Sequence, residues 1–466
     1  MFHVEQILAT IAISGILFSG MAPAESAQNT VPTFSFALST DNQESKRATQ
    51  NALLDLLLGW DESADSYFQE AISHDANNAL AYAGLCLTNP QNTEYRQKLK
   101  EIFELSAAEL LPHETFYIEA LLKLSAGHYD LACQDFCQRA DRFRGDKVAN
   151  VWAVILLHSA DLAYHPETGE PGSKQNEAIE RISKLTVNYP HDALVAYARA
   201  YIEQSAPEVS GDALAAALQS VEAFPNHPMP RLLMGHLLTR VGQYTQAVQH
   251  FNQAALLASK RGLSLENSPL WWKARLCEAT ALWSSSDTNQ ANKLINVLNS
   301  SQVQESAKLT ETSILRRWEC NTLPLRLLVA NSQVPTQRAI TTASNAATPK
   351  QPWKSNDYVL HVRDCLRASL SVRLKVQQNK LSDAKRSLEI AEKAKECLDH
   401  SYDSIVDESP SLISPWHRAQ EACTIAINLA KAALYKDTKQ IWLDNATQAK
   451  KAPNLMLPPV VPTRPL

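Results

Sequence analysis

Apolar residues recur every three or four positions through most of the chain, which is the spacing expected of helices with one buried face. The clearest stretch, residues 226–257, contains two such segments separated by Gly242. In the second segment, Ala247, Phe251 and Ala254 place a small, a large and a small side chain on one helical face. Because glycine readily ends a helix, this stretch predicts two antiparallel helices joined by a tight turn.

The triplet of small, large and small residues recurs at intervals of about 34 residues along the chain. One copy, formed by Lys98, Ile102 and Leu105, is degenerate but in phase. A further copy lies in the C-terminal part. The positions that define the repeat are Gly59, Ala64, Phe68, Ala71, Gly127, Tyr129, Ala132, Phe136, Pro190, Pro225, Gly235, Gly242, Tyr244, Ala247, Phe251 and Ala254.

This pattern resembles the tetratricopeptide repeat (TPR), in which glycine, tyrosine, alanine, phenylalanine and alanine stand at these spacings. One whole repeat matches, and weaker copies span most of the chain. The tryptophan that the family favours early in its first helix is replaced by Arg231 in the best copy. The resemblance implies an all-α fold: a TPR-like solenoid of helical hairpins wound into a superhelix, with a C-terminal helical part.

In TPR proteins the first helix of each pair lines a concave groove that binds a peptide or protein partner. Aromatic and arginine side chains suit such a wall because they combine contact area with polar tips. The tyrosines could instead only fill gaps between helices. The lysine and asparagine clamp of some family members is missing, because Leu232 and His236 stand there. The groove positions implied by the repeat phase are Tyr117, Tyr197, Tyr201, His236, Thr239, Arg240, Lys273 and Trp283.

Composition divides the chain into parts. An apolar run that ends in Ala22, Pro23 and Ala24 is typical of a secretory signal peptide cleaved after Ala24, although a buried or anchoring helix is the alternative. Thr, Ala, Ser, Gln and Pro without apolar periodicity predict a flexible linker before the last helices. The predicted parts are a signal peptide at 1–24, a TPR-like solenoid at 41–330, the linker at 331–356, a C-terminal TPR-like helical bundle at 357–452 and a proline-rich tail at 453–466.

The chemistry-bearing residues form no recognised catalytic motif. Common nucleophile, phosphate-binding and metal-helix patterns are missing. Cys133 with Cys137, or His361 with Cys365, could each supply two zinc ligands. Two ligands are too few for a metal site, and such cysteines are usually buried apolar residues. We therefore expect neither a metal nor a cofactor.

Overall composition narrows the partner classes. A hydrophobic content of 45% lets the chain bury a large core, and only 12 glycines favour helix. The net charge of −5 gives no basic field for nucleic acid. The eight cysteines form an even set in a chain with a predicted export signal, so disulfides are permitted but their pairing is open. His113 and Glu114 are interpreted as solvated polar groups of a helix.

The repeat and the leader together predict a non-enzymatic scaffold of the periplasm or cell envelope that binds a protein or peptide partner. We expect no nucleic-acid partner, and membrane contact only through an uncleaved signal peptide. One alternative is a repeat protein that binds a small molecule or glycan, with Trp271, Trp272 and Trp283 stacking on sugar rings. A less favoured alternative is an enzyme of unrecognised type.

Overall fold

The structure is a computed structural model, and it describes residues 38–450 apart from 91, 107–109, 160–162, 165–169, 260–267, 286, 299–355 and 401–412. Within these residues every regular element is a helix, and the one β-bridge, between Tyr164 and Pro171, is isolated. The predicted all-α fold is therefore confirmed. The predicted signal peptide, linker and tail lie outside the described residues, apart from Asn356 at the end of the linker range.

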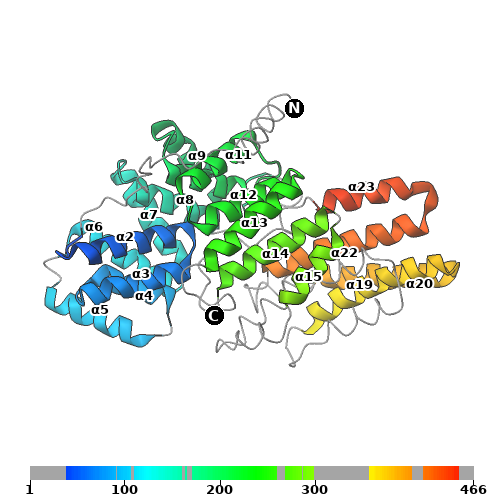
Figure 1. Ribbon diagram of the computed structural model, residues 1–466, viewed down its shortest axis with the longest axis horizontal. Coiled ribbons are helices and arrows are strands. Elements are labelled where there is room, and N and C mark those ends of the chain that lie inside the picture. The colour runs from blue at the N-terminus through cyan, green and yellow to red at the C-terminus, as the bar shows by residue number, and fades with distance from the viewer. Residues whose placement is uncertain are drawn as a thin grey trace, which may run out of the picture. The chain divides into compact units, whose positions relative to one another are not determined.

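The described residues up to Leu237 form one compact unit, and those from Leu238 form a second. The first unit consists of helix pairs that follow one another along the chain, from the blue to the green helices of Figure 1. Its helices are α2 (Gln43–Leu58), α3 (Asp61–His74), α4 (Ala79–Thr88), α5 (Thr93–Ser106), α6 (Pro112–Ser125), α7 (Tyr129–Arg142), α8 (Lys147–Ser159), α9 (Ser173–Asn188), α10 (Ala193–Glu203), α11 (Gly211–Ala223) and most of α12 (Pro228–Arg240).

The second unit continues the alternation of helices. Three of its pairs are α14 with α15, α19 with α20, and α22 with α23, and a short 3-10 helix, η3 (Lys436–Thr438), joins the last two helices. The bounds are α13 (Tyr244–Ser259), α14 (Pro269–Ser284), α15 (Thr288–Leu298), α19 (Asn356–Gln377), α20 (Leu381–His400), α22 (Ile413–Leu434) and α23 (Lys439–Lys450). The succession of helical hairpins fits an α-solenoid, and its superhelical winding stays a prediction.

Glycines mark three of the turns between helices. Gly59, Gly127 and Gly242 have φ values of 83°, 80° and 81°, in the left-handed region that side chains with a Cβ avoid. In each case the glycine follows the first helix of a pair, where the sequence pattern places a break. The glycine at this position therefore lets the chain reverse within a few residues.

The small, large, small positions lie at close helix contacts. Phe68 of α3 is buried, and its ring packs against the bare backbone of Gly84 on α4. A Cβ added to Gly84 would lie only 2.2 Å from Cζ of Phe68. The large residue of one pair thus occupies space that only a glycine on the next pair leaves open. Gly84 was not among the predicted repeat positions.

The degenerate copy departs from its predicted register. Leu105 is 84% exposed, while Leu99 and Ile102 are buried. On a helix, the face shared by Leu99 and Ile102 next recurs at position 106, the last position of α5. Leu105 therefore points away from the buried face.

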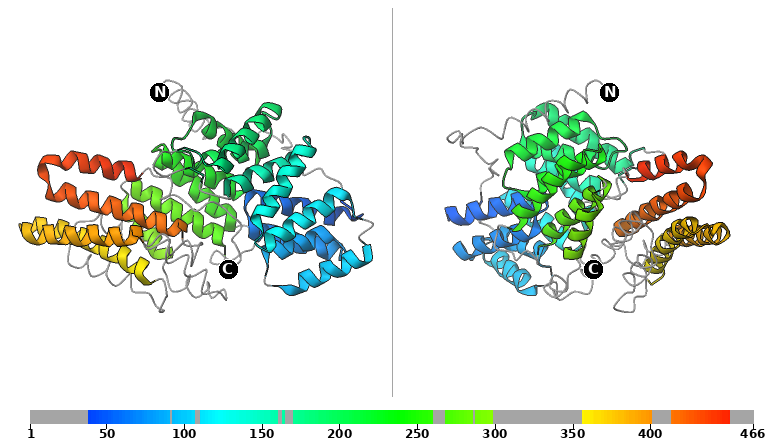
Figure 2. Two further views of the ribbon diagram at one scale, coloured as in Figure 1. Left: turned by 180° about the vertical axis from the view of Figure 1, so that it is seen from behind. Right: turned by 45° about the vertical axis from the view of Figure 1, so that its right-hand side comes forward.

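The C-terminal helices form a seam of small and aliphatic residues. A cluster from α19, α20 and α22 consists of Val362, Cys365, Leu366, Ala368, Val372, Ala384, Leu388, Ala391, Ala394, Leu398, Cys423, Ala426, Ile427 and Ala430. A second cluster joins α22 and α23 to α14 and α15 through Leu276, Ala279, Leu282, Trp283, Ala291, Ala422, Ile425 and Ala446. Helices before and after the predicted linker therefore share a core, as the yellow-to-red and light-green helices of Figure 2 illustrate.

Candidate binding surface of the helical repeats

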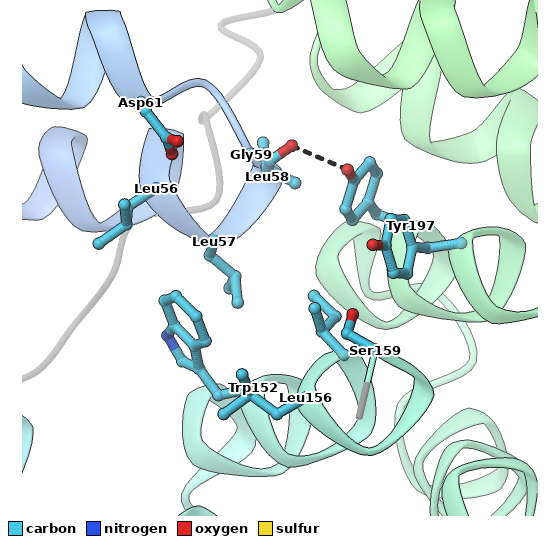
Figure 3. Close-up of a pocket in the computed structure, with 11 residues that line it drawn as sticks. Leu56, Leu57, Leu58, Gly59, Asp61, Trp152, Leu156, Ser159 and Tyr197 are labelled. Carbon is cyan, nitrogen blue, oxygen red and sulfur yellow. Dashed lines mark hydrogen bonds between the residues drawn. The ribbon is translucent and has the colours of Figure 1, made fainter. Parts of the chain in front are cut away.

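Two of the predicted groove residues meet on α10. The Tyr197 and Tyr201 rings stack with centroids 6.1 Å apart, one helical turn from each other. The Tyr197 hydroxyl donates a 2.8 Å hydrogen bond to the carbonyl oxygen of Leu58, at the end of α2 (Figure 3). These partners are 139 residues apart in sequence. Tyr197 thus joins the first helix pair of the unit to the fifth.

Burial suppresses ionisation of both rings. It raises the pKa of Tyr197 well above its usual value, with the neighbouring Tyr201 adding to the shift. It also raises the pKa of Tyr201 to about 12, despite a hydrogen bond with Ser159 that favours the ionised form. At neutral pH both tyrosines are neutral and serve as hydrogen-bonding and packing groups.

A small cavity lies beside these tyrosines. Its walls come from the end of α2, from α8 and from α10, and Figure 3 shows Trp152 and Leu156 facing Leu57 across it. The cavity volume is about 20 Å³. One ordered water needs at least about 10–15 Å³ measured in this way. The space therefore suits a single water and is far too small for a sugar ring or a peptide side chain.

The buried His158 packs against Tyr201. The Nδ1 atom of His158 lies 2.8 Å from Oε1 of Gln175, and the imidazole meets the Tyr201 ring edge-on at 5.3 Å. Since an amide oxygen only accepts hydrogen bonds, Nδ1 carries the proton of a neutral imidazole. Burial lowers the pKa of His158 to about 4, against the opposing effect of the Gln175 bond. His158 is therefore neutral at physiological pH.

A second polar contact joins α2 to the start of α12. Nε2 of His227 lies 3.4 Å from Oδ1 of Asp55, and the Ser63 hydroxyl donates a hydrogen bond to Oδ2. The His227 ring packs edge-on against Trp60 at 5.1 Å. The backbone N–H of Met229 donates to Nδ1 of His227 at 3.2 Å, so Nε2 carries the proton. An aspartate within the apolar run of α2 is the sequence signal that could have identified this contact.

The three residue types of a Ser-His-Asp triad are present here in the wrong order. The carboxylate of Asp55 receives the Ser63 hydrogen bond and also faces His227, so it lies between them. In a triad the imidazole must accept the serine proton. All three side chains are also buried. This cluster is consequently a structural tie between helices.

Tyr117 lies apart from the α10 tyrosines. It is buried on α6, and its hydroxyl donates to Oδ1 of Asp146 at 3.2 Å. Arg139 of α7 donates to Oδ2 of the same carboxylate at 2.6 Å, and its guanidinium lies 4.6 Å from the Phe116 ring centroid. Asp146 also accepts from the N–H of Ala149 at the start of α8. Tyr117 therefore belongs to a joint between consecutive pairs.

The other predicted groove residues are also mostly covered. On α12, His236, Thr239 and Arg240 are buried. On α14, Lys273 is half-buried, and Trp283 is buried in the cluster that includes Ala279 and Ala291. Among the eight residues, burial of seven favours the interpretation that they fill space between helices. Their assignment to a partner-binding groove stays a prediction, and their burial gives it no support.

The contact of the non-helical residues 38–40 with α6 was not predicted from the sequence. The backbone N–H of Ser39 donates a 2.9 Å hydrogen bond to Oε2 of Glu114, 75 residues away. Glu114 is only 1% exposed, and Leu38 and Thr40 are buried on either side of Ser39. The prediction that Glu114 is solvated is wrong, because this segment covers it. Glu114 stands in the first turn of α6, where the helix dipole favours a carboxylate.

The described part of the chain holds no cluster suited to a metal. No group of three His, Cys, Asp or Glu side chains that could hold a metal ion occurs there. Likewise, none of its helices is long and apolar enough to cross a bilayer. Cys133 is buried, Cys137 is half-buried, and Cys365 is buried in the C-terminal cluster.

Comparison of the sequence with known protein families and curated proteins gave no match. The fold and the contacts above therefore carry the functional argument.

Proposed function

We propose that the protein is a non-enzymatic scaffold of the periplasm or cell envelope whose helical repeats bind a non-helical segment of a protein partner. The contact between Ser39 and Glu114 carries this proposal. There, a carboxylate on a helix of the repeat array accepts a hydrogen bond from the backbone N–H of a non-helical segment, with buried side chains on either side. Recognition of a backbone donor by a carboxylate is compatible with many partner sequences, while the neighbouring side-chain positions supply selectivity.

The location of the binding surface follows from this contact. A partner segment would lie on α6, against the first turn, and would compete with residues 38–40 of the chain. This site differs from the tyrosine positions implied by the TPR resemblance, because Tyr197 and Tyr201 are already engaged inside the unit. The proposal therefore keeps the predicted class of function and moves its site.

The glycan alternative has less support. Trp271, Trp272 and Trp283 are all buried, and the Trp271 ring meets Trp272 edge-on at 5.9 Å. A tryptophan stacks on a sugar through an open ring face. The burial of all three indole rings therefore favours the protein scaffold over the sugar-binding alternative.

The experiment uses a chain that lacks residues 1–40 and a fluorescent peptide with the sequence of residues 36–42. The peptide should bind saturably, and Glu114→Ala should weaken binding by roughly tenfold or more, because hydrogen bonds to charged groups contribute about 1.5–3 kcal/mol. Glu119→Ala is the matched control, since Glu119 is exposed on the same helix. Circular dichroism must show equal helicity for all three chains.

Two outcomes would count against the proposal. If the truncated, folded chain does not bind the peptide at millimolar concentration, α6 is not a peptide site. If Glu114→Ala and Glu119→Ala bind equally to the parent, the carboxylate does not recognise the segment. Once peptide binding is established, capture from an envelope extract with the parent and Glu114→Ala chains would identify the natural partner, and N-terminal sequencing of the envelope protein would test cleavage after Ala24.

A further inference from the structure

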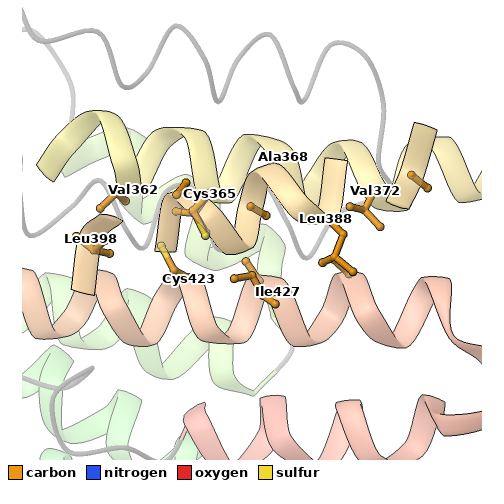
Figure 4. Packing of buried hydrophobic residues seen from close by; sticks show 14 residues of the cluster. Val362, Cys365, Ala368, Val372, Leu388, Leu398, Cys423 and Ile427 are labelled. Atoms are coloured by element: carbon orange, nitrogen blue, oxygen red, sulfur yellow. The ribbon is translucent and has the colours of Figure 1, made fainter. Parts of the chain in front are cut away.

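Two cysteines meet in the core of the C-terminal helices. Cys365 on α19 and Cys423 on α22 are both 0% exposed and belong to one apolar cluster. Figure 4 shows both side chains directed into the space between these helices. The thiols hydrogen-bond to each other, and both are free in the structure. Two sulfur atoms therefore lie in contact across a helix interface.

The residues around the thiols allow a close approach of the two backbones. Ala368 stands three positions after Cys365, and Ala426 stands three positions after Cys423, so each alanine shares a face with its cysteine. Both alanines belong to the same cluster. Small side chains at a helix contact shorten the distance between axes, and a disulfide requires Cα atoms within about 7 Å. This contact is thus suited to a covalent bridge.

We propose that Cys365 and Cys423 form a disulfide that fastens α19 to α22 when the chain folds in an oxidising compartment. The proposal is independent of any partner on α6. It requires an oxidant, which the expected export would supply. A bridge between Cys365 and Cys423 leaves six cysteines, so it reduces the 105 complete pairings of eight cysteines to 15.

The bond forms by thiol–disulfide exchange with a small disulfide such as oxidised glutathione. The thiolate of one cysteine attacks a donor sulfur, forms a mixed disulfide and releases one glutathione thiolate. The second cysteine then attacks the first protein sulfur, the mixed disulfide breaks, and the second glutathione leaves. Two protein thiols lose two protons and two electrons, and one glutathione disulfide is reduced to two thiols.

Burial determines when this reaction can occur. It raises the pKa of Cys423 well above its usual value, and the bond with Cys365 adds to the shift. Since the thiolate is the attacking species, the folded core protects the pair from exchange. The bridge therefore forms during folding, before α22 closes on α19, and it resists reduction afterwards.

The chain contains a matched pair that should not bridge. Cys133 and Cys137 also share a hydrogen bond, but they stand one turn apart on the same helix, α7. Cβ atoms in this relation are about 5–6 Å apart, whereas a disulfide needs about 3.5–4.5 Å. The two thiols are in contact in both pairs, but only Cys365 and Cys423, on separate helices, can adopt the geometry of a disulfide.

The test refolds the full chain from reduced, denatured protein in a glutathione redox buffer. Tryptic mapping without reductant should find the peptide of residues 364–367 linked to that of residues 419–431. The midpoint of thermal unfolding should rise by roughly 5–10 °C relative to the reduced chain. Cys365→Ala and, separately, Cys423→Ala should abolish the shift, while Cys133→Ala should retain it.

If both Cys365 and Cys423 are alkylated when the chain refolded in the redox buffer is denatured without reductant, the proposal is overturned, as it is by a bridge from either residue to another cysteine. An internal disulfide in the peptide of residues 124–139, formed as readily as the interhelical one, would refute the geometric argument. Because the oxidant is added in vitro, failure here is distinct from failure of export or of peptide binding.

Discussion

The first unit and the C-terminal helices hold their helices together by different means. In the first unit, buried polar groups connect helices that are distant in sequence, as Tyr197 does with Leu58 and His227 does with Asp55. In the C-terminal helices, the cluster shared by α19, α20 and α22 is made of alanine, aliphatic residues and two cysteines. Hydrogen bonds require specific distances and angles. Directional contacts therefore fix distant helices of the first unit in register, whereas the buried cluster of α19, α20 and α22 is held by close packing.

This difference indicates where each region is vulnerable. Removing one partner of a buried polar contact leaves the other without its hydrogen bond, which costs more than the bond contributed. The alanine-rich cluster of α19, α20 and α22 is made of small and aliphatic side chains, and it is instead destabilised by a larger side chain. Variants of the first unit should thus show large, long-range effects. The following predictions run from the largest effect to the smallest.

Asp55→Ala should lower the free energy of unfolding by about 3 kcal/mol or more, because the Ser63 hydroxyl loses its buried acceptor and the His227 ring loses the carboxylate that it faces at 3.4 Å. Urea titration gives the magnitude, and hydrogen exchange should show faster opening in α10 than in α20. The exposed Asp41 provides the control, since Asp41→Ala should change stability by no more than about 0.5 kcal/mol. A loss below about 1 kcal/mol for Asp55→Ala would contradict the comparison.

His158 should make the first unit sensitive to acid. Its pKa is about 4 in the folded chain, against 6.5 for an unperturbed histidine, so the unfolded chain binds the extra proton between these values. The full stability is present above pH 6.5 and should decline, by at most about 3 kcal/mol, as the pH falls to 4. His158→Gln should flatten this part of the stability–pH curve, whereas His191→Gln, at an exposed site, should not. Identical curves for the parent and His158→Gln would exclude this role.

Gly84→Ala should destabilise the first unit by about 1–3 kcal/mol, because the new methyl group would clash with the Phe68 ring. Elsewhere in a helix the same change is stabilising by about 0.5–1 kcal/mol, so the sign of the effect is decisive. Gly145→Ala serves as the control, since open space surrounds that position and the change should be neutral or slightly stabilising. Thermal and urea unfolding of both variants would decide.

Tyr197→Phe should cost about 1 kcal/mol, because it removes only the hydroxyl that donates to Leu58 and keeps the stacked ring. Tyr435→Phe, at a 40% exposed position of the second unit, should be close to neutral. Double-mutant analysis with Asp55→Ala would show whether the two contacts between α2 and the later helices act together. Equal stability of the two phenylalanine variants would show that the Tyr197 bond contributes nothing measurable.

Local features of the fold were readable from the sequence. The two helices predicted within residues 226–257 correspond to α12 and α13, and Gly242, the predicted break between them, has the left-handed φ of a turn. These features depend on neighbours within one or two helical turns, because periodicity and capping are local signals. The approximate helix bounds and the turn positions could therefore be predicted from the sequence.

The candidate site was not readable in the same way. A helical pattern reveals which face is apolar, but it does not reveal which distant segment covers a polar residue on it. Glu114 looked like a solvated residue at a helix start, and it is covered by Ser39 and its neighbours. Tyr197 has the chemistry of an exposed binding residue, but it is buried because α10 packs against the end of α2. Both errors arise from contacts between residues far apart along the chain.

The hydrogen bond from Tyr197 to Leu58 also has a consequence for how the chain reaches its fold. Repeat arrays usually gain stability from neighbouring units alone, and so they tolerate loss or insertion of a repeat. Here the Leu58 carbonyl of the first hairpin gains its hydrogen bond only when the fifth hairpin is in place. This raises the contact order and slows folding. The number of hairpins between them is accordingly constrained: an added or deleted repeat would displace the partners of that bond, so this segment can vary in sequence more easily than in length.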